Sequence, residues 1–125
     1  MRDYRKYDVW QKAHELTLFV YKEVLTKFPK SEQFELASQL KRATYSIALN
    51  IAEGCGRNSD KDFLHFLDMA LGSVHEVEYC SLLSKDLDYI SEEIFNDLSE
   101  RINIVKQSLS ILLNQLESNV NAFCI

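Results

Sequence analysis

The scarcity of chain-breaking residues constrains this sequence more than any other feature. Its 125 residues include one proline and three glycines. Because glycine and proline punctuate turns and strand ends, such a chain favours long helices with short connections over many strands. The length suits one domain with a single core. The sequence contains no transmembrane run of about 18 apolar residues and starts without an apolar signal-peptide core, so we expect a cytoplasmic protein with no membrane partner.

Four segments carry apolar residues at the three- and four-residue spacing of an amphipathic helix. We expect the first helix from Val9 to Lys27, ended by Phe28-Pro29, and the second after an N-cap at Ser31. Ser59 and Ser91 are the expected N-caps of the third and fourth helices. The predicted core seams are Ala13, Leu16, Val20 and Val24; Leu36, Leu40, Ala43, Ile47 and Ile51; Phe63, Leu67, Ala70, Val74 and Val77; and Leu98, Ile102, Val105, Leu109, Leu112 and Leu116.

Four such helices with short turns predict an all-α, antiparallel up-down-up-down four-helix bundle. We place the bundle at residues 9–117, with an N-terminal tail at 1–8 and a C-terminal tail at 118–125. The first helix is apolar on all sides at LFVY, residues 18–21, and the second adds a row of small residues beside its seam. Excess apolar surface of this kind indicates an interface, and closed cyclic symmetry is the common way to bury it.

The stretch SIALNIAEGCGR, residues 46–57, places an amide and a carboxylate beside the core seam. Asn50 and Glu53 are spaced i,i+3, as are Ser73 and Glu76 on the third segment. Antiparallel neighbours would bring both pairs into one hydrogen-bonded cluster that fixes helix register, because buried polar groups need partners. A ligand site, an acid–base pair of Glu53 and Glu76, and a subunit boundary are the alternatives.

The three glycines have two expected uses. Gly54 and Gly56 stand where the end of a helix favours left-handed backbone. Gly72 lies inside the third segment, where glycine costs about 1 kcal/mol relative to alanine. We therefore expect Gly72 to mark a close crossing with another helix.

Metal chemistry has little support in the sequence. A di-iron bundle needs Glu-x-x-His on two helices and a glutamate on each of the others. The nearest match is the single Asp62-Phe63-Leu64-His65, and His14 and His75 have no partner at ligand spacing. We expect no metal and no cofactor.

Nucleophilic catalysis has equally little support. Cys55, Cys80 and Cys124 form no CxxC pair, which favours buried, inert thiols over a disulfide framework or a zinc site. GCGR lacks the glycines and the preceding strand of a phosphate-binding loop, and no nucleophile-elbow motif is present. We expect no catalytic residues.

The net charge of −5 is divided unevenly along the chain. Residues 1–57 carry ten Lys/Arg and seven Asp/Glu, which gives +3, and residues 58–125 carry four and twelve, which gives −8. An acidic protein repels nucleic acid at long range, but a local basic patch of Lys41, Arg42, Arg57 and Lys61 would contact phosphates. Solvated surface, or ion pairs between subunits, is the other interpretation of these four residues.

Three stretches together resemble a known family: VWQKAHEL, FPKSEQFELASQLKRATYSIALNIAEGCGR and FLHFLDMALGSVHEVEY. They are similar to the small bacterial four-helix bundle proteins encoded by intervening sequences within 23S rRNA genes, over residues 4–117. The resemblance implies a homopentamer with a central channel. The positions that match the family signature are Asn50, Glu53, Gly54, Gly56, Arg57, Gly72, Ser73 and Glu76.

The resemblance extends to a relative, the accessory variability determinant of diversity-generating retroelements. That similar pentameric bundle binds a reverse transcriptase and nucleic acid through a basic surface. This chain departs from that relative because it is acidic overall. Our first hypothesis is therefore a non-enzymatic, oligomeric scaffold or adaptor. The alternative is an RNA- or DNA-binding accessory protein, associated with a reverse transcriptase or with rRNA, that uses Lys41, Arg42, Arg57 and Lys61.

Overall fold

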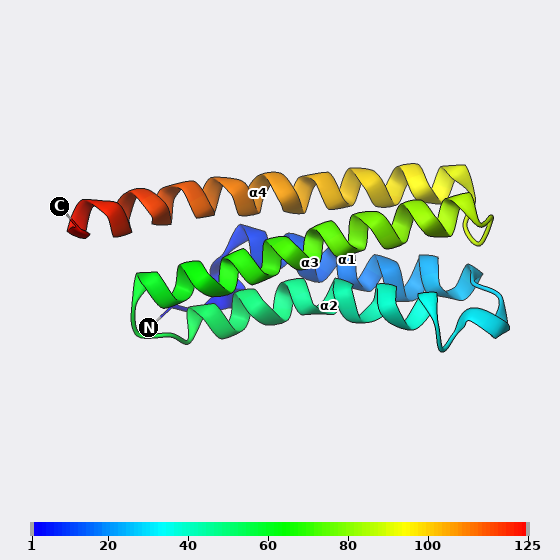
Figure 1. The fold of residues 1–125 in the computed structure, drawn as a ribbon, viewed down its shortest axis with the longest axis horizontal. Coiled ribbons are helices and arrows are strands. Elements are labelled where there is room, and N and C mark those ends of the chain that lie inside the picture. The colour runs from blue at the N-terminus through cyan, green and yellow to red at the C-terminus, as the bar shows by residue number, and fades with distance from the viewer. Residues whose placement is uncertain (1, 125) are drawn as a thin grey trace.

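A computed structural model describes residues 2–124 of the protein, with side chains through residue 121. Four long helices run through this range: α1 (Asp8–Phe19), α2 (Leu36–Cys55), α3 (Asp60–Asp86) and α4 (Glu92–Cys124). They lie side by side and alternate in direction (Figure 1). Residues 2–124 contain no β-strand. The predicted all-α, up-down-up-down four-helix bundle is confirmed.

Two short turns of different width extend the first helix beyond α1. A π-helical turn, η2 (Val20–Val24), and a 3-10 turn, η3 (Leu25–Lys27), continue α1 to the expected end point. Val20 and Val24, the first and last residues of η2, are both fully buried. Phe28 then adopts extended backbone before Pro29 (φ −70°, ψ 145°), as the residue before a proline should.

One of the three predicted N-caps is wrong. Ser31 is exposed within a short 3-10 turn, η4 (Lys30–Glu32), and α2 begins only at Leu36. Ser59 and Ser91 are confirmed, because their hydroxyl oxygens accept backbone N–H bonds from Asp62 and Ile94 at 3.1 Å each. The difference arises because residues 29–35 make local 3-10 bonds, such as Glu35 N–H to the Glu32 carbonyl, before the α-helix starts.

One core runs between the four helices. Nearly every predicted seam residue is buried, and the exceptions are Leu36 and Leu112, which are half-buried. On α4 the inward position is taken by Leu113. Cys55 and Cys80 are buried as expected, and the side chain of Cys124 lies outside the described residues.

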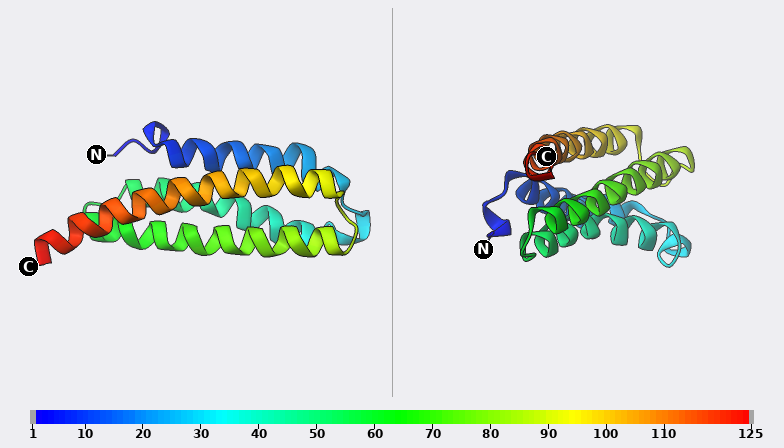
Figure 2. Two further views of the ribbon diagram at one scale, coloured as in Figure 1. Left: turned by 90° about the horizontal axis from the view of Figure 1, so that it is seen from above. Right: turned by 60° about the vertical axis from the view of Figure 1, so that its left-hand side comes forward.

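Both ends of the chain differ from the expected tails. Residues 118–124 continue α4, which projects beyond the other helices (Figures 1 and 2). Near the N-terminus a 3-10 turn, η1 (Tyr4–Lys6), precedes α1, and the Tyr4 ring packs edge-on against Trp10 at 4.9 Å between ring centroids. Tyr7 likewise contacts Phe63, at 5.8 Å. The segment before residue 9 therefore packs on the bundle.

Candidate interaction surface

Large apolar side chains remain exposed on the first two helices. We define the α1–α2 face as Leu18, Tyr21, Phe34, Tyr45 and Leu49, whose exposed fractions are 40%, 43%, 90%, 39% and 56%. Leu18 and Tyr21 are three residues apart, and Tyr45 and Leu49 four apart, so each pair forms a row on its helix. The half-buried Ala48 and Ala52 flatten the surface beside these rows. This is the broad apolar surface that the sequence predicts.

A groove joins the two helices within this face. It measures about 420 Å³ and is lined from one side by Leu25 and Thr26 and from the other by Gln33, Phe34, Ala37, Ser38 and Lys41. Leu25 lies one turn beyond Tyr21, and Lys41 lies one turn before Tyr45. The groove therefore joins the two sides of the face at the level of Leu25 and Ala37, with Tyr21 and Tyr45 one turn away. A surface this apolar is typical of a binding interface.

The polar set predicted around Asn50 is brought together only in part. Ser73 of α3 meets Ser46 of α2, with their hydroxyl oxygens 2.6 Å apart. Asn50 stays within its own helix, where its amide donates to the Ser46 carbonyl at 2.8 Å. Glu53 and Glu76 are exposed, and neither makes a side-chain hydrogen bond to residues 2–121.

The register contact between α2 and α3 is thus a serine pair, and the predicted four-residue cluster does not form. Ser46 was missed, although its position four residues before Asn50 was a usable signal. Because Glu53 and Glu76 point to solvent, they do not form an acid–base pair in the core.

The glycines have a different use from the one predicted. Gly54 is buried inside α2, and a Cβ atom there would lie 2.9 Å from both Phe63 Cδ1 and Phe66 Cβ of α3. Gly56 has right-handed backbone (φ −79°), and no glycine has a positive φ. Gly72 is exposed with nothing near its missing Cβ. The close helix crossing is therefore at Gly54, and the expectations of left-handed backbone and of a crossing at Gly72 are wrong.

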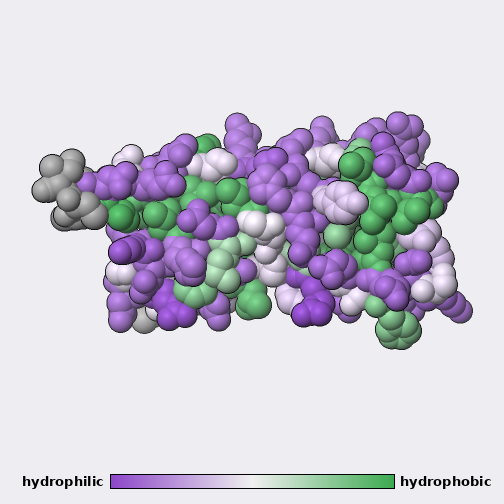
Figure 3. Space-filling model, in the orientation of Figure 1, coloured by the Kyte–Doolittle hydropathy of each residue, from purple (hydrophilic) through white to green (hydrophobic). Residues whose placement is uncertain are grey.

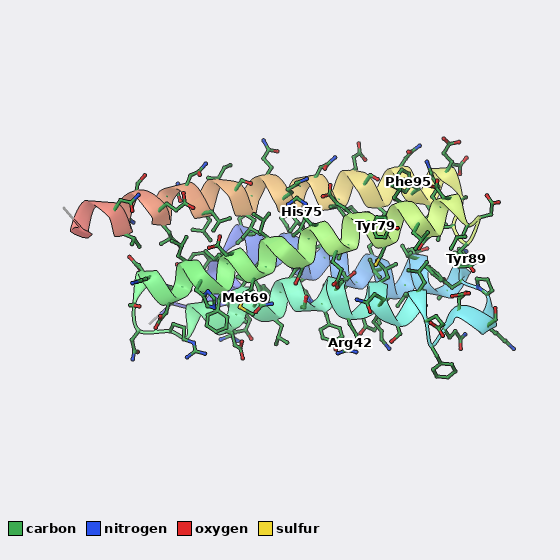
Figure 4. All side chains as sticks on the ribbon, in the orientation of Figure 1. Arg42, Met69, His75, Tyr79, Tyr89 and Phe95 are labelled. Atoms are coloured by element: carbon green, nitrogen blue, oxygen red, sulfur yellow. The ribbon has the colours of Figure 1, made fainter. Side chains whose placement is uncertain are left out.

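The four basic residues do not form one patch. Lys41 and Arg42 lie near the start of α2, whereas Arg57 and Lys61 flank the turn into α3. Cys55 lies fourteen positions after Lys41, which is about 21 Å along the helix. Arg42 projects away from the bundle on α2 (Figure 4). The guanidinium of Arg57 lies over the Phe66 ring, 4.6 Å from its centroid.

The comparisons with known proteins give the family. A family model described as the 23S rRNA-intervening sequence protein matches residues 5–111, which is most of the chain. The chain belongs to the 23S rRNA-intervening sequence protein family. The resemblance read from the three sequence stretches is confirmed.

A solved structure shares the fold of this family member. It is a crystal structure described as a protein with unknown function from the S23 ribosomal protein family of Bacteroides thetaiotaomicron VPI-5482. The two chains are 24% identical, and the match has a TM-score of 0.77 and covers 84% of this chain and 97% of the other. None of the curated proteins matches the chain. Neither description names a reaction.

Potential metal ligands among residues 2–121 lie apart in this family member, and Cys55 and Cys80 are buried. Within the described part of the chain, no three His, Cys, Asp or Glu side chains converge as a metal site. Burial raises the pKa of both the Cys55 and Cys80 thiols, which disfavours the reactive thiolate. No helix between residues 2 and 124 has the length and apolar character needed to cross a membrane.

Proposed function

We propose that this protein is a non-enzymatic, oligomeric helical scaffold or adaptor that assembles as a homopentamer. The α1–α2 face carries the proposal, because five large apolar side chains there are 39–90% exposed. Burying such a surface against another copy removes apolar area from water, at about 25 cal/mol per Å². Closed cyclic symmetry covers the surface on every copy. The subunit number comes from the family resemblance.

Light scattering coupled to size-exclusion chromatography tests the assembly. We expect the wild-type protein to elute at several times its 14.5 kDa subunit mass at micromolar concentration. Leu49→Lys should shift it toward the monomer, because the substitution places a charge on the α1–α2 face. Ile111→Lys on α4 is the matched control, since Ile111 is 54% exposed and Leu49 is 56% exposed. A wild-type protein that is strictly monomeric would contradict the proposal.

A second candidate function is RNA or DNA binding by an accessory protein. Arg57 and Lys61 are exposed at the turn between α2 and α3, where Arg2, Gly56, Arg57 and Asn58 line a hollow of about 620 Å³. The family name refers to 23S rRNA. Lys41 and Arg42 lie too far along α2 to share this contact on one subunit, although a ring of copies would repeat each group.

Filter binding at two salt concentrations tests this second candidate. Phosphate contacts release counterions, so the affinity must fall steeply as salt rises. Arg57→Ala with Lys61→Ala should weaken binding if the turn is the contact, whereas Lys41→Ala with Arg42→Ala tests the other end of α2. No binding at about 50 mM salt, where phosphate contacts are strongest, would rule the function out.

A further inference from the structure

A second apolar groove lies on the side of the bundle formed by α3 and α4. We define the α3–α4 groove as Glu78, Ser81, Leu82, Phe95, Ser99, Ile102 and Asn103, which line a hollow of about 300 Å³. Leu82 is 42% exposed, and the neighbouring Tyr79 is 63% exposed. Hydrophobic side chains gather where α3 ends and α4 begins (Figure 3), on the side to which Tyr79 and Phe95 belong (Figure 4).

The floor of this groove holds a buried hydroxyl without a partner. Ser81 is 1% exposed, and its Oγ makes no hydrogen bond to the described residues. The nearby Ser84 hydroxyl, by contrast, donates to the Cys80 carbonyl at 2.6 Å. An unpaired buried polar group costs about 1–3 kcal/mol. A polar side chain inserted into the groove from outside would remove that cost.

The charge of the two halves favours one kind of contact between copies. Residues 1–57, which include α1 and α2, carry +3, and residues 58–125, which include α3 and α4, carry −8. Contact between unlike halves of neighbouring copies is therefore favoured by net charge over contact between two acidic halves. A contact between an α1–α2 face and an α3–α4 groove is head-to-tail, because the two surfaces that meet are different.

The two surfaces also lie at the same height along the bundle. The Ser46–Ser73 contact fixes the register of the antiparallel α2 and α3. Ser38 lies eight residues before Ser46, and Ser81 lies eight residues after Ser73, so both are displaced about 12 Å toward the same end. A rotation about an axis parallel to the bundle preserves height, so a head-to-tail contact between these surfaces is compatible with a closed ring.

From the groove, the unpaired hydroxyl, the charges and the common height, we infer that the α3–α4 groove receives the α1–α2 face of the next copy. This inference rests on the proposed self-association and assigns its two surfaces. Phe34, which is 90% exposed, is the apolar side chain inserted by the neighbour. Ser38 and Lys41 flank it and bring polar groups to the height of Ser81. The partner is a second copy of this chain.

Two complementary variants test the assignment. Phe34→Asp places a charge on the α1–α2 face and leaves the α3–α4 groove intact. Leu82→Asp places a charge in the α3–α4 groove and leaves the α1–α2 face intact. Light scattering should show each variant alone as a monomer. An equimolar mixture should form a dimer of twice the 14.5 kDa subunit mass and nothing larger, because each partner offers one intact surface. Circular dichroism melts establish that both exposed-site variants fold.

Three results would overturn the assignment. If Leu82→Asp remains as large as the wild type, the groove is not part of the interface, and the proposed self-association still stands. If the mixture stays monomeric, the two surfaces do not pair with each other. If the control Ile111→Asp also becomes monomeric, the loss of assembly is not specific to the groove. A monomeric wild-type protein would instead refute the proposed function itself.

Discussion

The two ends of α2 show opposite kinds of packing. At its C-terminal end, which we call the closed end, Gly54 lets Phe63 and Phe66 of α3 approach the backbone, and Arg2 covers Phe63 from outside. At its N-terminal end, the open end, Phe34 is 90% exposed beside a groove of about 420 Å³. The same helix thus packs closely on its own chain through Gly54 at one end and has an exposed aromatic ring beside a groove at the other.

This difference separates folding from assembly. Substitutions at the closed end should change the stability of a single subunit, because the contacts there are made within one chain. Substitutions of exposed apolar residues at the open end, such as Phe34, should change association and leave the subunit stable. The predictions below test this division, in order of decreasing effect on subunit stability.

Gly54→Ala should produce the largest effect. Its methyl group would lie 2.9 Å from Phe66 Cβ, an atom fixed to the α3 backbone, so the helices must separate or shift. Overpacking of this kind costs about 1–3 kcal/mol, which exceeds the gain of about 1 kcal/mol in helix propensity. Urea unfolding followed by circular dichroism measures the change in the free energy of unfolding.

Gly72→Ala is the matched control. The same substitution in the middle of α3 meets nothing within 4 Å, so the propensity gain is unopposed. We expect stabilisation by about 0.5–1 kcal/mol. If both alanine variants shift stability in the same direction, close packing at Gly54 does not control the closed end.

Arg2→Ala should have the next largest effect. The Arg2 guanidinium pairs with Asp60, donates to the Arg57 carbonyl at 2.8 Å and lies 4.4 Å from the Phe63 ring centroid. Its side chain is 19% exposed, so screening by water is limited. We expect a loss of about 1 kcal/mol in unfolding free energy. Arg5→Ala, whose side chain is 71% exposed, should change much less, and equal losses would contradict the role of Arg2.

A pH-dependent contact lies at the open end. The Tyr89 hydroxyl donates to Glu32 Oε1 at 2.9 Å and so links the α3–α4 turn to η4. That hydrogen bond to the carboxylate raises the pKa of Tyr89 above its usual value of 10.0. Because the folded state favours the neutral phenol, the contribution is complete below pH 10 and is lost as pH rises through the raised pKa.

Comparison with Tyr89→Phe isolates this contact. The wild type should be more stable than the variant at neutral pH, and the difference should disappear as the pH rises above about 10. Urea unfolding midpoints across that pH range measure this stability difference. Tyr79→Phe controls for the loss of a hydroxyl, since Tyr79 is 63% exposed. A stability difference that persists at the highest pH would contradict the link.

The sequence predicts which residues are buried in the core better than it predicts the contacts between particular helices. Seam positions such as Leu40, Ile47 and Leu67 are recognisable because their spacing alone decides which side of a helix they occupy. Gly-Cys-Gly does mark the end of α2, which stops at Cys55, but Gly54 is constrained by Phe63 and Phe66 on the next helix and not by left-handed backbone. A contact between helices leaves no local pattern.

The candidate surface was predictable only in outline. The apolar stretch at residues 18–21 and the alanines of α2 indicate an interface before any coordinates. Phe34 could not be placed, because the expected cap at Ser31 put it inside the helix, whereas α2 begins at Leu36. Ser81 has no sequence signal either, since a serine in a helix usually bonds to its own backbone.

Phe34→Ser should have the smallest effect on the subunit and a clear effect on assembly. A side chain that is 90% exposed contributes little to its own fold, so we expect a change within about 0.5 kcal/mol for the isolated chain. An assembling wild-type protein should melt at a higher temperature as its concentration rises, because association stabilises the folded state. The variant should melt at one temperature at all concentrations, equal to the dilute limit of the wild type. A lower melting temperature than that limit would mean that Phe34 stabilises its own subunit, and the open end would then resemble the closed one.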